Sequence, residues 1–371
     1  MTPISRKLAA KRKGAQSALQ VVSIGGGTGL STLLSGLKKY SHGGLCADGD
    51  RSPEVEITAV VTVSDDGGSS GRLRRDFDIL PPGDIRNCMT ALSEDEALLS
   101  HLFRHRFSSG RGLKGHSFGN LFLTAMHQIT GDFAQAVKLS SEILAIRGRI
   151  FPATSANIAL EAELNDGSIV KGESKISKSK SPIRKVRLRP DDSEPLPETL
   201  EAIGQADLIT LGPGSLYTSV IPNLLVNGLA EAVSRSEALK VYFGNLMWQP
   251  GETFQFSASQ HVAAIHSHAG MRLIDCVVLN TAPIPISLQK RYARSNVQPV
   301  ENDFSNLAKM GVKVVTGNLV GQPSATHRKI RHDPAALADI VVDLAARARA
   351  FQVKKHNLNE HRKQVARKPV Q

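Results

Sequence analysis

Residues 20–37 read QVVSIGGGTGLSTLLSGL, and this stretch decides the fold. An apolar run at 21–24 is typical of a buried strand. The glycine-rich segment 25–29 follows, and leucines then recur at helical spacing, at Leu30, Leu33, Leu34 and Leu37. The order of strand, glycine turn and helix predicts the first unit of an α/β fold.

The glycine turn predicts a cradle for a nucleotide or a phosphate. Glycine lets the backbone turn sharply and approach a ligand, and a helix start offers free N–H groups to an anion. The alternative is a tight turn without a ligand. Leu30 stands where the dinucleotide motif has its third glycine, and no Lys-Ser/Thr pair follows. The loop therefore indicates neither a standard NAD dehydrogenase nor a P-loop ATPase.

A second glycine turn occurs in the same setting. The predicted strand 207–211 runs directly into GPGSLYTS at 212–219. Two such loops in one chain strengthen the prediction of a phosphate site. The strand predicted at 239–243 follows, and Asn245 and Gln249 come just after it.

Paired aspartates end another predicted strand, at 55–63. Asp65 and Asp66 would lie at its carboxyl end, where open α/β sheets bind ligands. They could hold a ribose hydroxyl, a base edge or a Mg²⁺ ion with its waters. The alternative is a polar turn with a capping aspartate.

Further polar residues lie at predicted helix starts. His116, Ser117 and Asn120 precede or open a helix that ends near residue 130, and ligand hydrogen bonding is favoured there over nucleophilic catalysis. Arg331 comes just before the helix opened by Asp333 and Pro334, a position that suits an anion. Metal binding is not predicted, because the histidines between 261 and 268 have no carboxylate or cysteine nearby.

Composition bounds the class of protein. The chain has 371 residues, of which 41% are hydrophobic, so it can bury a full core. No apolar run reaches the roughly 18 residues of a membrane helix, and the three cysteines are scattered, which fits a reducing cytoplasm.

Most of the net charge of +12 belongs to the two ends of the chain. Residues 1–20 hold five basic side chains and no acid, and residues 351–371 hold six against one acid. We therefore expect disordered basic tails at 1–18 and 351–371 and a single α/β domain at 19–350. Residues 155–190 would form a β-hairpin with a solvated basic excursion. Nucleic-acid binding by the tails is a minor alternative.

These motifs resemble the gluconeogenesis factor family of bacteria, which is related to the 2-phospho-L-lactate transferases of deazaflavin cofactor synthesis. The resemblance spans about residues 21–350. It is carried, in order, by IGGGTGLS, TVSDDGGSSGRLR, ILPPGDIRN, LKGHSFGNL, ITLGPGSLYTS, QPGET and IRHD.

The resemblance implies a Rossmann-like, doubly wound and mainly parallel sheet. It also implies a nucleotide-sugar ligand of the UDP-N-acetylglucosamine class and a cytoplasmic regulatory role that links carbon metabolism to cell-wall synthesis and cell shape. Expected partners are a cell-wall-precursor enzyme and further copies of the chain. The alternative is a Mg²⁺-dependent transferase similar to the phospholactate enzymes, with a nucleotide-linked donor and a deazaflavin-type acceptor.

The motif matches and the polar residues above together define the predicted ligand site. Tyr292 belongs to the segment KRYARSNVQPV, which resembles the corresponding segment of the family, and Trp248 is a peculiarity next to the predicted ligand residue Asn245. The predicted site residues are Gly25, Gly26, Gly27, Thr28, Gly29, Asp65, Asp66, His116, Ser117, Asn120, Gly212, Gly214, Ser215, Asn245, Gln249, Tyr292 and Arg331.

Overall fold

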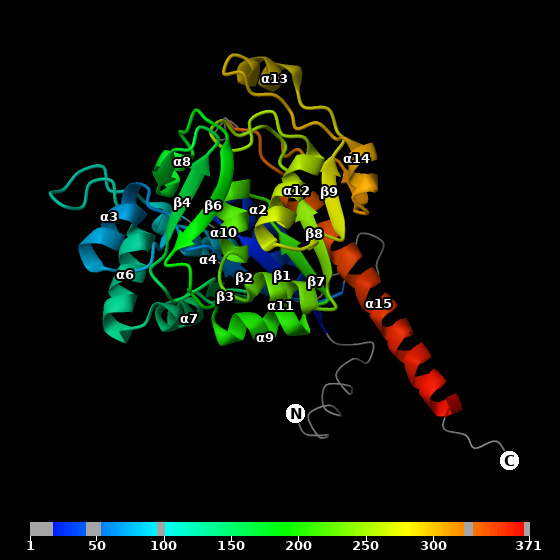
Figure 1. Cartoon of the computed structure of the whole chain (residues 1–371). Helices are drawn as coiled ribbons and strands as arrows, with labels where there is room; N and C mark the ends of the chain where they lie inside the picture. The colour runs from blue at the N-terminus through cyan, green and yellow to red at the C-terminus, as the bar shows by residue number, and fades with distance from the viewer. Residues whose placement is uncertain (1–17, 42–52, 95–100, 323–328, 367–371) are drawn as a thin grey trace.

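Strand β1 (Leu19–Gly25) lies inside a parallel sheet that organises the molecule (Figure 1). The structure is a computed structural model that describes residues 18–41, 53–94, 101–322 and 329–366. These residues form a seven-stranded sheet of order β10-β9-β8-β7-β1-β2-β3, in which every pair is parallel. The other strands are β2 (Val55–Val61), β3 (Arg149–Pro152), β7 (Leu208–Leu211), β8 (Leu239–Phe243), β9 (Cys276–Asn280) and β10 (Lys313–Gly317).

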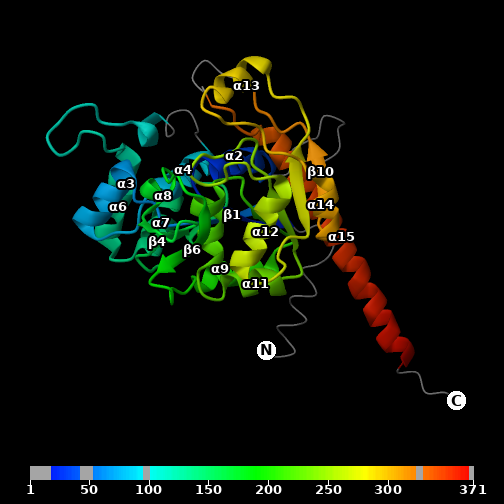
Figure 2. The ribbon, with the colours of Figure 1, turned by 45° about the horizontal axis from the view of Figure 1, so that its top comes forward.

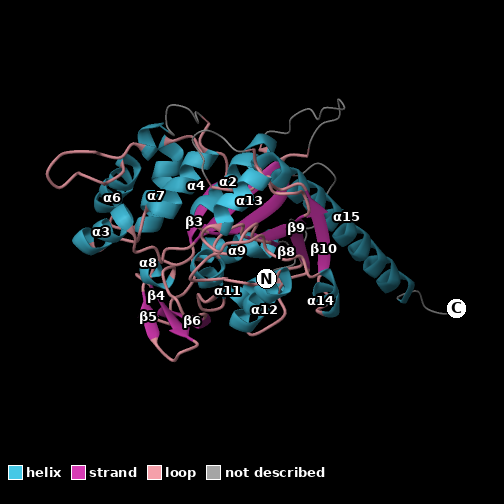
Figure 3. Cartoon of the chain, turned by 90° about the horizontal axis from the view of Figure 1, so that it is seen from above, coloured by secondary structure: helices cyan, strands magenta, loops and turns pink. Residues whose placement is uncertain are grey.

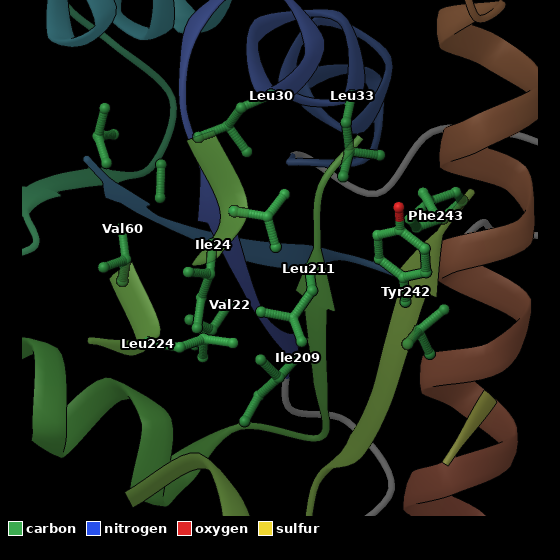
Figure 4. Close-up of a cluster of buried hydrophobic side chains, with 14 of the residues drawn as sticks. Val22, Ile24, Leu30, Leu33, Val60, Ile209, Leu211, Leu224, Tyr242 and Phe243 are labelled. Carbon is green, nitrogen blue, oxygen red and sulfur yellow. The ribbon is translucent and has the colours of Figure 1, made fainter. Parts of the chain in front are cut away.

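The central strands are buried on both faces, as near-continuous apolar runs require. Val22 and Ile24 of β1 pack against side chains of neighbouring strands and of the following helix, including Leu211 and Leu30 (Figure 4). Helices cover both sides of the sheet (Figure 3). The α/β fold with a doubly wound, mainly parallel sheet is confirmed. The flanking helices include α2 (Gly27–Leu37), α4 (Gly83–Leu92), α9 (Pro197–Gln205), α11 (Leu229–Arg235) and α15 (Pro334–Ala366).

The order of the strands reverses between β1 and β7. From β1 the chain moves outward to β2 and β3, and it later returns to β7 and moves the opposite way to β10. In doubly wound sheets, ligands bind at the carboxyl ends of the strands at such a reversal. Both glycine loops leave the sheet at this place.

Some of the remaining helices begin at a residue whose side chain caps the first turn. Ser117 caps α6, for example, and Asp132 caps α7. Helix α3 instead begins without a side-chain cap, and its first turn is built of glycine and serine. These helices are α3 (Gly68–Phe77), α6 (Phe118–Thr130), α7 (Phe133–Ile143), α10 (Ile221–Leu224), α12 (Ala258–Ala269), α13 (Ile286–Ala293) and α14 (Phe304–Lys309).

A small antiparallel sheet of order β5-β4-β6 contains the predicted β-hairpin. It comprises β4 (Ala159–Leu164), β5 (Ile169–Lys171) and β6 (Ile183–Arg189), and the short helix α8 (Glu173–Ile176) lies between the last two strands. The basic side chains of this excursion are exposed, but the segment also forms a strand that the sequence pattern does not predict. Strand β6 pairs with β4 and buries Val186 and Leu188, while its arginines face outward and pair with glutamates of β4.

Helix α15 extends past the predicted domain boundary at residue 350 and reaches Ala366, so helical structure enters the expected C-terminal tail (Figure 1). Arg349 forms an ion pair with the buried Asp207 just before that boundary. Beyond it, the side chains described up to residue 359 are mostly exposed. The predicted N-terminal tail lies outside the described residues except for Ala18. Within the described ranges, no helix combines the length and apolar character needed to cross a membrane.

Candidate functional site

A pocket of about 600 Å³ opens at the carboxyl ends of β1, β7 and β8, at the reversal of strand order. Helix α13 projects beyond this end of the sheet (Figure 1, Figure 2) and contributes Tyr292 to the wall. The structure brings many of the predicted site residues together here: Gly26, Gly27, Thr28, Gly29, Gly214, Ser215, Asn245, Gln249, Tyr292 and Arg331.

The two glycine loops meet on one side of the pocket. A Cβ atom on Gly29 would lie 2.2 Å from the carbonyl oxygen of Pro213, far inside van der Waals contact. Only glycine therefore allows the loops to approach this closely. Helix α2 begins at Gly27, and Gly26 before it has no side chain to cap the first turn. The first N–H groups of α2 thus lie beside the pocket, where their dipoles favour an anion.

Asp84 of α4 also lines the pocket, although it was not among the predicted site residues. Its carboxylate accepts a hydrogen bond from the backbone N–H of Gly27. Burial raises the pKa of Asp84 to about 7, and the negative charge of Asp65 adds to the rise, while the Gly27 hydrogen bond opposes it. Asp84 therefore changes its charge close to neutral pH.

Glu173 is a second carboxyl group that sequence reasoning missed. It lies on α8, inside the segment that was predicted to be a solvated excursion, and the small sheet turns it into the pocket. The pKa of Glu173 is raised to about 9, mainly by burial and further by the negative charges of Asp65 and Asp84. It therefore carries a proton at neutral pH and can donate a hydrogen bond. No sequence signal separates it from the other glutamates.

A hydrogen-bonded chain of side chains joins the loops that follow β7 and β8. The Nδ2 of Asn245 donates to Oε1 of Gln249 at 3.0 Å, and the Nε2 of Gln249 donates to Oγ of Ser215 at 2.8 Å. Glu252, 6% exposed, accepts the backbone N–H of Tyr217 at 3.2 Å and so holds the same two loops together. The predicted residues Asn245, Gln249 and Ser215 thus support one another at the pocket wall.

The segment at 329–332 brings two cations, Lys329 and Arg331, to the pocket. The backbone N–H of Ile330 donates to the hydroxyl of Tyr292 at 3.0 Å. The Nε2 of His332 lies 3.1 Å from the carbonyl oxygen of Gly244, and burial lowers the pKa of His332 to about 4. The neutral histidine therefore donates this bond. Tyr292 and His332 fix the backbone on both sides of Arg331, which explains why Tyr292 and Arg331 share one pocket.

Other predicted site residues do not line the pocket. Gly25 ends β1, and Gly212 directly follows β7 as the first residue of the second glycine turn. Asp65 accepts the N–H of Gly67 at 2.8 Å, and Asp66 accepts the N–H of Ser174 at 2.9 Å. These aspartates hold the starts of α3 and α8.

His116, Ser117 and Asn120 form a network between helices. Ser117 accepts a hydrogen bond from Arg86 at 2.8 Å, His116 lies 3.0 Å from the hydroxyl of Ser69, and Asn120 donates to Ser70 at 3.4 Å. This network joins α3, α4 and α6. Among the described residues, no group of three or more histidine, cysteine or acidic side chains is placed to hold a metal ion.

Comparisons with known proteins place this site in a family context. The family model described as 2-phospho-L-lactate transferase CofD matches residues 21–320, which include both glycine loops. The chain is similar to the gluconeogenesis factor of Bacillus subtilis, with 46% identity over 325 residues, covering 88% of this chain and 98% of the relative. It is also similar to a putative gluconeogenesis factor of Nostoc sp., with 47% identity over 324 residues, covering 87% of this chain and 68% of the relative.

A crystal structure of a Bacillus halodurans protein has a similar fold. Its TM-score is 0.82 at 46% identity, and the match covers 88% of this chain and all of the other.

Proposed function

We propose that this chain, which belongs to the 2-phospho-L-lactate transferase CofD family, is a regulatory protein that binds a nucleotide sugar. The proposed ligand is of the UDP-N-acetylglucosamine class. The relatives named gluconeogenesis factor are similar over nearly the whole of this chain, which supports a role in carbon metabolism. The wider proposal is a cytoplasmic role that links this metabolism to cell-wall synthesis and cell shape.

The observation that carries the proposal is that two glycine loops and two cations line the same pocket. The start of α2 and the turn at 212–215 offer backbone N–H groups, and Lys329 and Arg331 lie on another wall of the same pocket. A diphosphate needs this combination of N–H donors and fixed positive charge. The pocket volume of about 600 Å³ is in the range of small-molecule sites, about 300–1,000 Å³.

The test is calorimetry of the full chain with UDP-N-acetylglucosamine. Arg331→Ala should weaken binding by about 1.5–3 kcal/mol, since it removes a charge-assisted contact. Tyr292→Phe should cost about 0.5–1.5 kcal/mol, because the N–H of Ile330 loses its acceptor and the segment that carries Arg331 loosens.

The matched control is Arg294→Ala. Arg294 is exposed at the end of α13 and does not line the pocket, so its removal should leave the affinity unchanged. If Arg331→Ala binds the ligand as tightly as the Arg294→Ala control, the diphosphate site is misplaced. If the unmodified chain does not bind, the proposed function fails.

A transferase similar to the phospholactate enzymes is the second candidate, and Asp84 is the observation that favours it. An acid with a pKa of about 7, beside the proposed phosphate site, could take up a proton from an attacking hydroxyl at neutral pH. Asp65 and Asp66 already accept backbone N–H groups, so the side chains alone do not form a cage for Mg²⁺.

Mass spectrometry separates the two candidates. A regulatory protein should return UDP-N-acetylglucosamine unchanged after incubation with or without Mg²⁺. A transferase should consume a nucleotide-linked donor when a deazaflavin acceptor is present, and Asp84→Asn should stop that turnover. Product that forms in the unmodified chain and disappears in Asp84→Asn would replace the regulatory proposal with the transferase.

The proposed protein partners need their own measurement. We propose self-association and binding to an enzyme that makes cell-wall precursors. Sedimentation of the full chain with and without UDP-N-acetylglucosamine tests the first part, and a single monomeric species in both samples would contradict it.

A further inference from the structure

Trp248 lies in the pocket wall, and the hydrogen bonds described above give it no role. We propose that its indole ring is the surface against which the nucleobase of the ligand packs, which makes Trp248 a specificity-determining residue. This inference rests on the proposed nucleotide-sugar function and goes beyond it by assigning the two ends of the ligand.

The backbone holds Trp248 beside the wall that carries Tyr292. The N–H of Trp248 donates to the carbonyl oxygen of Gln298 at 2.9 Å, and Met247 pairs with Pro299 in an antiparallel bridge. The N–H of Val297 in turn donates to the carbonyl of Tyr292 at 3.1 Å. The loop after β8 and the chain after α13 are therefore joined, and both aromatic residues line the same pocket.

The N–H group of the indole makes no hydrogen bond to the described residues. The Nε1 of Trp248 is buried and has no hydrogen-bond partner among the described residues. A buried donor without a partner costs about 1–3 kcal/mol, and a buried tryptophan normally finds one. Within the described residues, the ring of Trp248 thus makes its contacts through its flat apolar area, which lines the pocket. Phe254 supports the ring from one side, with centroids 5.5 Å apart and an interplanar angle of 67°.

The pocket divides by chemistry in a way that orients the ligand. The glycine loops suit the phosphates, and the carboxyl groups of Asp84 and Glu173 suit the hydroxyl groups of a sugar. Trp248 and Tyr292 supply aromatic surface, which suits a flat, uncharged base. The geometry thus places the base at the aromatic wall and the sugar beside the carboxyl groups.

The experiment uses the fact that Trp248 is the only tryptophan in the 371-residue sequence. Tryptophan fluorescence of the full chain therefore reports on this position alone. Titration with UDP-N-acetylglucosamine and with UDP should change the emission to a similar extent. Titration with N-acetylglucosamine 1-phosphate, which has no base, should leave the emission unchanged.

Variants then test whether the ring contributes to affinity. Trp248→Ala should weaken UDP binding by about 5- to 150-fold, the effect of losing one base-stacking contact. Trp248→Phe keeps an aromatic face and should stay within about threefold of the unmodified chain. Phe77→Ala is the control for loss of an aromatic side chain, because Phe77 is half-exposed on α3 and does not line the pocket, and it should bind UDP normally.

The outcomes separate this inference from the function on which it rests. If calorimetry shows binding of UDP-N-acetylglucosamine but Trp248→Ala keeps full affinity, the base does not pack on Trp248, and the proposed function stands. The same holds if N-acetylglucosamine 1-phosphate shifts the emission as UDP does, or if Trp248→Phe fails to restore affinity. If calorimetry of the unmodified chain shows no binding, both the function and this inference fall.

Discussion

Replacing Gly29 with alanine tests the close approach of the two glycine loops. The added Cβ would lie 2.2 Å from the carbonyl oxygen of Pro213 and 2.9 Å from the Cα of Gly214. Ordinary van der Waals contact begins at 3.4 Å, so the loops must separate by about 1.2 Å. Both neighbours are backbone atoms and cannot turn aside as a side chain could.

The loss of folding stability in Gly29→Ala follows from this displacement of the two loops. Overpacking of this kind costs about 1–3 kcal/mol, and backbone contacts on both sides place Gly29→Ala near the upper end. Alanine recovers up to about 1 kcal/mol of helix propensity in α2, which leaves a net loss of about 2 kcal/mol. A chain of this size should then melt about 3 °C lower. Ligand affinity should fall at least about tenfold, because the N–H donors move by about 1 Å relative to each other.

Calorimetric melting measures the expected fall in melting temperature, and titration with UDP-N-acetylglucosamine measures the expected fall in affinity. Gly204→Ala is the matched control, since Gly204 lies in α9 and a Cβ there meets no atom within 4 Å. That control should gain up to about 1 kcal/mol and keep its affinity. A Gly29→Ala variant that melts and binds like the control would refute the argument that the two loops meet.

Three further predictions concern charge. Affinity for a diphosphate should fall as the pH rises through about 7, because Asp84, with a pKa of about 7, becomes a carboxylate beside the phosphates. Calorimetry at several pH values should show this decrease in affinity, and Asp84→Asn should remove it. The free energy of unfolding should fall as the pH is lowered from 6.5 to about 4, because His332 and His261 stay neutral in the folded chain, with pKa values of about 4, while the same histidines bind protons in the unfolded chain. Urea titrations at several pH values should show a smaller fall for His332→Gln, and a fall as large as that of the unmodified chain would contradict this cause. Arg349→Ala should lower the free energy of unfolding by about 2–4 kcal/mol, because Asp207 would remain as a buried charge without its cation. Removing residues 352–371 should leave the melting temperature nearly unchanged, and equal effects of the two changes would contradict the ion-pair argument.

Local patterns were sufficient for most of the sheet and many helices. The apolar residues at 21–24 and 241–243 have to be buried on both faces, whatever their neighbours are, so β1 and β8 could be predicted without knowing the order of strands. Helix caps such as Ser117 and Asp333 act on N–H groups three residues away, which is also local. The edge strands β3 and β10 lack a comparable run and were missed.

The sequence alone determined that two glycine loops follow buried strands, because the pattern that marks a loop lies within a few residues of it. Only the tertiary structure decided which side chains share the pocket. Strand order brings β1 beside β7, the small sheet turns Glu173 inward, and the Ile330–Tyr292 hydrogen bond places Arg331. The same packing directs Asp66 toward α8 and away from the pocket wall. These choices depend on contacts between residues far apart in the chain, and such contacts leave no periodic signal along it.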